Sequence, residues 1–140
     1  MATSRLAGIQ AGDELPSREF TPDNIQLMMY NAALWNAHLI HYDLPYATEV
    51  EGYPGLVTPG PLLGDWLSQC VMDWLGEDGT LVSFEYSNRK ASYAGETLVS
   101  GGQVVSVDEA SGLVKLEMFI KDEAGDNTSP GFATVRISPA

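Results

Sequence analysis

The chain has 140 residues, 44% of them hydrophobic and 19% charged, and its 7 Lys and Arg against 19 Asp and Glu give a formal net charge of −12. This length and composition predict one globular domain over residues 1–140 with a full hydrophobic core, and the acidic balance argues against nucleic-acid binding because carboxylates repel phosphates. The single cysteine, Cys70, excludes an internal disulfide and a cysteine-based metal site. No apolar run is long enough to cross a membrane, and the N-terminus lacks the apolar segment of a signal peptide, which favours a cytoplasmic location.

The first predicted elements are an extended arm over residues 1–20 and a helix over about residues 22–34. Thr21 is the expected N-cap, Pro22 suits the first helical position, and Asp23 places a negative charge in the first turn. Helical spacing then continues through the apolar side chains Ile25, Met28, Met29, Ala32 and Ala33.

Residues 36–60 are too rich in helix-breaking and strand-breaking residues to form one long element. They contain both histidines of the chain, His38 and His41. So long an ordered, irregular segment in a small domain favours a functional role. The residues that interrupt it are Pro45, Gly52, Pro54, Gly55, Pro59 and Gly60.

The most apolar element is a helix predicted to begin at Pro61 and to end before Gly76, its expected C-cap. Its Leu, Trp, Cys and Val side chains recur at helical spacing, so we expect the most buried helix of the fold, with Cys70 as a buried, inert thiol. Strands are predicted over residues 81–86, 97–107, 113–121 and 132–137, which are rich in β-branched and aromatic residues. Short connections between them predict an antiparallel meander packed against the helix, which is an α+β domain.

The segment from Asn36 to Leu62 also resembles a known family. Its pattern Asn-Ala-His-Leu-Ile-His-Tyr-Asp, followed by Gly-Tyr-Pro-Gly-Leu-Val and by Gly-Pro-Leu, is similar to MaoC-type hydratases. The similarity is greatest to the branch of mesaconyl-CoA hydratase and hydroxyacyl-thioester dehydratase type 2, and weaker matches flank it at residues 12–16 and 93–98. The resemblance implies a single hot-dog fold, in which an antiparallel sheet wraps around a long central helix. It also implies a dimer, because one hot-dog unit usually pairs its sheet with a second copy.

Hydration of a 2-enoyl thioester requires a base for water, a proton for C2 and hydrogen-bond donors for the thioester oxygen. A histidine suits the first two tasks, and His41 is the candidate. The backbone N–H of Gly60 suits the third, because Pro61 has no N–H. The resemblance implies that Asn36 orients water, which Asn can do without exchanging protons, although capping of the first helix explains Asn36 equally well. Asn36 and His41 are five residues apart, so they converge only if the chain leaves the helix between them.

Six more residues are candidates for the substrate site: His38, Tyr42, Pro59, Leu62, Arg89 and Lys90. Pro59 stands where this branch usually has histidine, so one side chain that could contact substrate or water is missing. The cationic pair Arg89-Lys90 is either a solvated turn or a site for a CoA phosphate. We expect the CoA or carrier-protein thioester to be part of the substrate, with no separate cofactor and no metal.

The leading functional hypothesis is an enoyl-thioester hydratase, which in reverse is a (3R)-hydroxyacyl-thioester dehydratase. A second hypothesis is a subunit that contributes structure or half a site to a heteromeric hydratase, motivated by the missing histidine at position 59. A third is a hot-dog thioesterase that uses Asp65, on the central helix, as its carboxylate. A divergent lyase or isomerase is the fourth.

Overall fold

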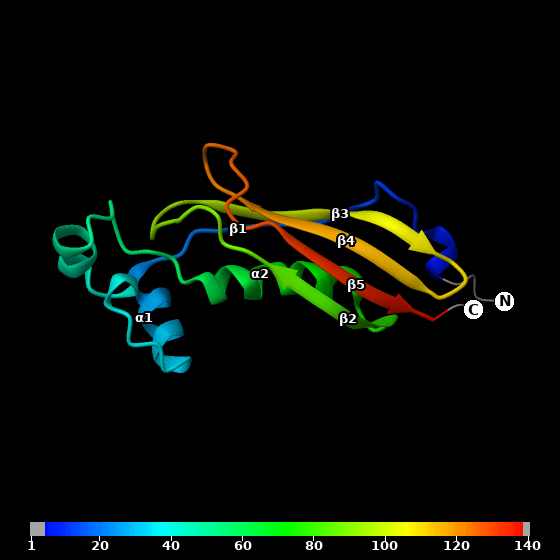
Figure 1. Ribbon diagram of the computed structural model, residues 1–140, viewed down its shortest axis with the longest axis horizontal. Coiled ribbons are helices and arrows are strands. Elements are labelled where there is room, and N and C mark those ends of the chain that lie inside the picture. Colours follow the sequence, from blue (N-terminus) through cyan, green and yellow to red (C-terminus); the bar gives the residue numbers. More distant parts are fainter. Residues whose placement is uncertain (1–4, 139–140) are drawn as a thin grey trace.

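The computed structural model describes residues 5–138, which form one five-stranded sheet and two α-helices. Helix α2 lies along one face of the sheet, and the sheet curves around it (Figure 1). Every strand pair is antiparallel, and the spatial order is β1-β3-β4-β5-β2. The predicted α+β architecture with a central helix is therefore confirmed. The elements are β1 (Glu14–Phe20), α1 (Asn24–Ala33), α2 (Gly60–Leu75), β2 (Gly79–Tyr86), β3 (Leu98–Asp108), β4 (Leu113–Lys121) and β5 (Gly131–Ile137), with short helical turns at Arg5–Gly8, Leu39–His41 and Tyr46–Val50.

The core lies between α2 and the concave face of the sheet. Successive side chains of a strand point to opposite faces, and β4 follows this rule along its whole length, with burial at every second position. Helix α2 presents its apolar stripe to the same layer, so both elements bury one side of their surface. Full burial of each such side chain is worth about 1.5–3 kcal/mol. The members with at most 1% exposure include Leu67, Val71 and Leu75 of α2 and Val114, Leu116, Met118 and Ile120 of β4.

The expected extended arm over residues 1–20 is wrong, because residues 5–8 form a short helical turn and residues 14–20 form the edge strand β1. This strand pairs with β3, and Leu15 opposite Gly102 is its buried side chain. The other side chains of β1 are exposed or half-buried, and the register shifts between Leu15 and Arg18. With one inward residue, a proline and a bulge, β1 lacks the alternation by which strands are recognised. Residues 1–4 of the arm lie outside the described part of the chain.

The predicted meander is also corrected, at β2. This strand pairs with β5 at the far edge of the sheet, so only β3, β4 and β5 form a meander. After Tyr86 the chain crosses the sheet to reach β3. Sequence neighbours need not be sheet neighbours, and the long β2–β3 connection permits the crossing. The residues of that connection lie at the N-terminal end of α2, where the site is found.

Helix α1 begins two residues later than predicted, and its N-cap is Asp23 instead of Thr21. The Asp23 carboxylate accepts a hydrogen bond from the Gln26 N–H at 2.8 Å, as an N-cap side chain does. Helix α2 begins at Gly60, one residue before the predicted start, with Pro59 at the N-cap. Gly76 is its C-cap, as predicted, with a φ of 60°.

Residues 24–58 extend beyond one end of the sheet (Figure 1). This segment contains α1, the turn with His41 and the irregular loop that leads into α2. The predicted ordered loop is thus confirmed, and it delivers the chain to the N-terminus of the central helix. Over residues 5–138, no helix has both the length and the apolar character needed to cross a bilayer.

Candidate functional site

A cavity of about 300 Å³ lies beside the N-terminus of α2. Three segments that are far apart in the sequence form it: the turn with His41, residues 57–63, and the connection after β2. It brings together four of the predicted site residues, and it adds polar groups that the sequence did not point to. The lining residues are His41, Val57, Thr58, Gly60, Leu63, Asn88, Arg89, Lys90, Ala91 and Ser92.

His41 is held in one tautomer by the backbone. Its Nδ1 lies 2.7 Å from the Val57 carbonyl oxygen, and because a carbonyl only accepts, Nδ1 carries the proton and Nε2 keeps its lone pair. The side chain is buried, with 7% exposure. Burial lowers the pKa of His41, partly offset by the Val57 hydrogen bond, and the neighbouring His38 lowers it further. His41 is therefore neutral near pH 7 and ready to accept a proton at Nε2.

Backbone hydrogen bonds fix Val57 between two other segments. Its N–H donates to the Ile40 carbonyl at 2.9 Å, and Val57 forms an antiparallel bridge with Tyr93. Next to it, the Thr58 N–H donates to the Ser92 carbonyl at 2.8 Å. The carbonyl that orients His41 is thus anchored on both sides, which makes it a rigid partner.

Gly60 places a free backbone donor in the cavity. It is the first residue of α2, and its N–H has no partner among the hydrogen bonds of residues 5–138. Pro61 contributes no N–H, while the Leu62 and Leu63 N–H groups both point to the Pro59 carbonyl. The Gly60 N–H is therefore a free donor at the positive end of the helix dipole, where anions are stabilised, and its role as an oxyanion donor stays a prediction.

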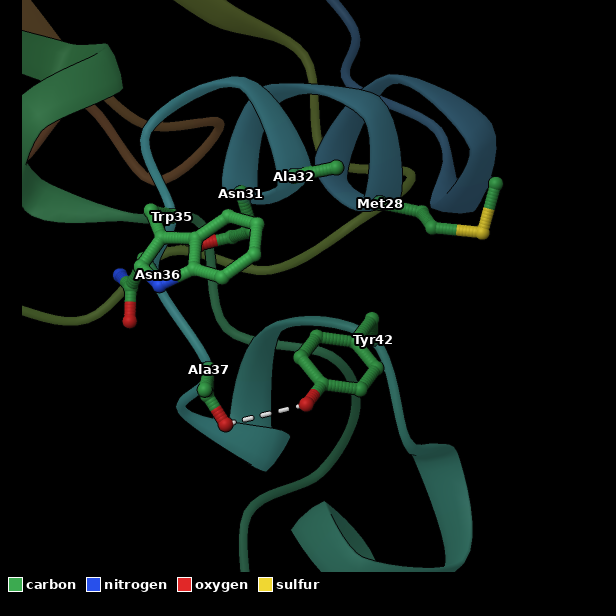
Figure 2. A pocket seen from close by; sticks show the side chains of 7 residues that line it. All are labelled: Met28, Asn31, Ala32, Trp35, Asn36, Ala37 and Tyr42. Atoms are coloured by element: carbon green, nitrogen blue, oxygen red, sulfur yellow. Dashed lines mark hydrogen bonds between the residues drawn. The ribbon is translucent and has the colours of Figure 1, made fainter.

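Asn36 and Tyr42 line a different cavity, of about 430 Å³, between α1 and the turn that follows it (Figure 2). The side-chain Oδ1 of Asn36 accepts a hydrogen bond from the His38 backbone N–H at 3.1 Å, and the Tyr42 hydroxyl donates to the Ala37 backbone carbonyl at 3.0 Å. The Asn36 backbone N–H also donates to the Asn31 carbonyl at 2.8 Å, which closes the C-terminus of α1. The capping interpretation of Asn36 is confirmed for its backbone, and its side chain does not line the cavity of His41.

The remaining predicted residues occupy separate positions. His38 is exposed, its Nδ1 accepts from the Ile40 N–H at 3.4 Å, and its ring centroid lies 5.6 Å from that of His41. Pro59 is the buried N-cap of α2, and Leu62 belongs to the hydrophobic core. The leucine of α2 that lines the cavity of His41 is Leu63.

Arg89 and Lys90 both line the cavity, but their charges are differently engaged. The Lys90 ammonium contacts the carboxylates of Asp122 at 2.6 Å and Asp126 at 2.8 Å, and these hydrogen bonds raise the pKa of Lys90. Among residues 5–138, no carboxylate forms an ion pair with Arg89. Arg89 is exposed, so its guanidinium is the cation available to an anionic group at the mouth of the cavity.

Asp65, the candidate carboxylate of a thioesterase, lies on the exposed side of α2. Its carboxylate accepts a hydrogen bond from the Tyr30 hydroxyl at 2.7 Å, and Asp65 is not among the residues that line the cavity of His41. Within residues 5–138, no group of three or more His, Cys, Asp or Glu side chains could hold a metal ion.

Sequence reasoning missed three polar residues of the cavity: Thr58, Asn88 and Ser92. Thr58 is 3% exposed and Ser92 0%, and neither hydroxyl has a hydrogen-bond partner within residues 5–138. No motif marks these residues, and the crossing after β2 that brings residues 88–92 to α2 could not be read from local patterns.

Residues 3–94 match the family model of hydroxyacyl-thioester dehydratase type 2. A hydroxyacyl-thioester dehydratase type 2 of Schizosaccharomyces pombe is 54% identical over 44 residues, which cover 31% of this chain and 15% of that protein. A mesaconyl-C(4)-CoA hydratase of Chloroflexus aurantiacus is 53% identical over 47 residues, which cover 34% of this chain and 17% of that protein. The chain thus matches only a small part of the length of these relatives.

Solved structures share the fold at low sequence identity. A MaoC-like dehydratase superposes with a TM-score of 0.88 at 21% identity, covering 97% of this chain and 43% of the other. The (R)-hydratase of A. caviae gives a TM-score of 0.84 at 16% identity, covering 93% and 98% of the two chains. A chain of the ChsH1–ChsH2 complex of Mycobacterium tuberculosis gives 0.81 at 18% identity, covering 92% and 98%. The predicted hot-dog fold is confirmed by these neighbours.

Proposed function

Since the chain belongs to the hydroxyacyl-thioester dehydratase type 2 family, we propose that it catalyses the hydration of 2-enoyl thioesters and the reverse dehydration of (3R)-hydroxyacyl thioesters. The observation that carries the proposal is the cavity shared by His41, a buried base with a free Nε2, and the unpartnered Gly60 N–H. A proton acceptor and an oxyanion donor in one cavity are what this chemistry needs.

The proposed reaction uses His41 twice. Nε2 takes a proton from water as the water oxygen bonds to C3, and the electron pair of the C2–C3 double bond moves toward the thioester oxygen. The Gly60 N–H stabilises the negative charge on that oxygen at the positive end of α2. The proton on Nε2 then passes to C2 as the carbonyl re-forms, so water has been added and His41 is neutral again.

The substrate carrier is proposed to lie toward Arg89. With a net charge of −12, the protein repels anions in general, so a CoA phosphate or a carrier-protein phosphopantetheine needs a local cation. Arg89 lines the cavity and has no carboxylate partner in the described part of the chain. The proposed chemistry requires no resident cofactor, because the thioester is part of the substrate.

This function is tested by incubating the purified chain with crotonyl-CoA and with a mesaconyl-type CoA thioester. Hydration is monitored as a loss of enoyl-thioester absorbance. His41→Ala is expected to lower kcat by about 10²–10⁴-fold, the usual contribution of a general acid–base group. His38→Ala is the comparison variant: His38 is exposed and does not line the cavity, but it caps the turn of His41 and lowers its pKa, so a much smaller loss is expected. Full activity of His41→Ala, or equal losses in both variants, would contradict the mechanism.

A second candidate is a subunit of a heteromeric hydratase. It is favoured by the position of Asn36. The Asn36 side chain accepts a hydrogen bond from the His38 N–H and lines another cavity. The polar side chain expected beside His41 is therefore not among the residues that line the cavity of His41. The solved neighbours include two complexes, ChsH1–ChsH2 and HadBC of Mycobacterium tuberculosis. An active homodimer in sizing and kinetic experiments would exclude this candidate, and a chain that gains activity only with a second hot-dog subunit would support it.

A dimer, homomeric or heteromeric, is proposed to form through the free edge of β2. This strand is last in the order β1-β3-β4-β5-β2, so one side of its backbone has no partner strand among the described residues. It exposes Leu81, Val82 and Tyr86. An unpaired edge with apolar side chains favours pairing with a second strand. The compartment stays a prediction: the sequence favours the cytoplasm, whereas the relatives from S. pombe and Saccharomyces cerevisiae are named as mitochondrial.

A further inference from the structure

Asn88 lies directly against the first residue of α2. It follows β2 by two positions, and its amide nitrogen is 2.4 Å from the point where a Cβ would stand on Gly60. No side chain fits at position 60 unless Asn88 moves, so the glycine and the amide occupy adjoining space. Both residues line the cavity of His41.

The orientation of the Asn88 amide is set by Ser129. The Ser129 hydroxyl, on a residue with 0% exposure, donates to the Asn88 carbonyl oxygen at 3.0 Å. The carbonyl oxygen therefore faces Ser129 and is 3.9 Å from the Gly60 Cβ position, while the NH₂ group faces Gly60. Among the hydrogen bonds of residues 5–138 the NH₂ group has no acceptor, and neither has the Gly60 N–H. Two N–H donors without an acceptor thus come from adjoining residues of one cavity, at the N-terminus of the helix.

The same cavity contains two further polar groups. The hydroxyls of Thr58 and Ser92 are buried and have no hydrogen-bond partner in the described part of the chain. An unpaired buried hydroxyl is destabilising, and both residues line the cavity. Free donors and unpaired hydroxyls around one space suit a ligand with several hydrogen-bonding groups.

We propose that Asn88 is a catalytic residue, whose amide NH₂ donates a second hydrogen bond to the thioester oxygen beside the Gly60 N–H. This inference rests on the proposed function. Negative charge develops on that oxygen as water adds to C3, and two donors that already face it stabilise the charge without rearranging. Ser129 is a positioning residue, since it holds the amide in the orientation that presents its NH₂ group.

Steady-state kinetics with crotonyl-CoA test the role of Asn88 through three variants. Asn88→Ala is expected to lower kcat about 10- to 100-fold with a smaller change in KM, below the full effect of a buried oxyanion donor because Asn88 is exposed. Asn88→Asp keeps the shape and the acceptor for Ser129 but replaces the donor by a carboxylate oxygen, so its kcat should fall further. Ser87→Ala, next in sequence and outside the cavity, should leave kcat unchanged.

A spectroscopic measurement separates this inference from the proposed function. Crotonyl-CoA labelled with ¹³C at the thioester carbonyl, bound to His41→Ala protein, should show a carbonyl stretch at lower frequency than in water, because the donors polarise it. The shift should shrink when Asn88→Ala is added. If His41→Ala abolishes hydration but Asn88→Ala and Asn88→Asp keep kcat within threefold and leave the carbonyl stretch unmoved, the role of Asn88 is refuted and the proposed function stands. If the wild-type chain has no hydratase activity alone or with a partner subunit, both fall.

Discussion

Replacing Trp35 with glycine should stabilise the protein. Trp35 has a φ of 57°, the only positive φ at a non-glycine residue among residues 5–138, and its side chain is 94% exposed. It occupies the position after the C-cap of α1, where its N–H donates to the Ala32 carbonyl while Asn36 donates to Asn31. Helices usually place glycine at this point, because a Cβ is strained in the left-handed region.

The magnitude follows from two opposing quantities. The left-handed conformation costs an ordinary residue about 1–2 kcal/mol, and the greater freedom of glycine in the unfolded chain costs about 0.5–1 kcal/mol. The exposed indole loses little on removal because almost none of its surface is buried. Trp35→Gly should therefore gain about 0.5–1 kcal/mol, or a rise in Tm of about 1–4 °C for a chain of this size.

Thermal unfolding by circular dichroism, with urea unfolding followed by the fluorescence of the buried Trp66, measures this gain. Trp35→Ala is the control, because it removes the indole but keeps a Cβ at the same φ, so it should not share the gain. Equal stabilities of the two variants would refute the reasoning. A wild-type Tm that falls on dilution, with a Trp35→Gly Tm that does not, would instead show that an assembly buries the indole.

Three other predictions concern titration and charge. The lowered pKa of His41 places the acid limb of the kcat/KM profile below pH 6.5. Because the unfolded chain binds that proton more readily, the free energy of unfolding should also fall as the pH drops below about 6.5. His41→Gln should remove this contribution to the pH dependence in a pH series of urea unfolding. The Asp122 carboxylate accepts hydrogen bonds from Lys90 and two backbone N–H groups, so Asp122→Ala should lower the free energy of unfolding in urea by about 2 kcal/mol. Asp126→Ala should lower it by less than about 0.5 kcal/mol, because the Asp126 side chain is 62% exposed. Equal losses in the two variants would contradict the reasoning that burial makes Asp122 the more important partner. Burial raises the pKa of the Cys70 thiol to about 11, so iodoacetamide at pH 8 should label the folded protein far more slowly than the protein in urea, and equal rates in mass spectrometry would show an accessible thiolate.

The sequence predicted the elements that have a strong internal period. The bounds of β4 agree with the predicted range 113–121, and α2 differs from its predicted start by one residue. In both, a regular apolar pattern coincides with the buried face, so the local signal and the tertiary packing agree. The edge strand β1 has one buried side chain and a proline, so its existence depends on pairing with β3, which no local pattern encodes.

The sequence predicted the placement of the candidate site residues only in part, and their chemical roles stay predictions. His41 and Gly60 share a cavity as expected, because both belong to the motif that delivers the chain to α2. Asn36 belongs to the same motif, yet the left-handed Trp35 and the bond from the His38 N–H direct it to another cavity. Asn88 reaches the site only because β2 lies at the far edge of the sheet, a long-range feature.

The carbonyl of Val57 links the reactivity of His41 to a small part of the structure. Val57 is held by the Ile40 carbonyl and by its bridge to Tyr93, outside the five-stranded sheet and at the loop end of the hydrophobic core. Contacts between loop segments open at a lower free energy than global unfolding requires. Once the contacts of Val57 open, the His41 imidazole is free to exchange tautomers and rotate, while the rest of the fold persists. Heat inactivation should therefore precede melting, and substrates that bridge His41 and α2 should delay it.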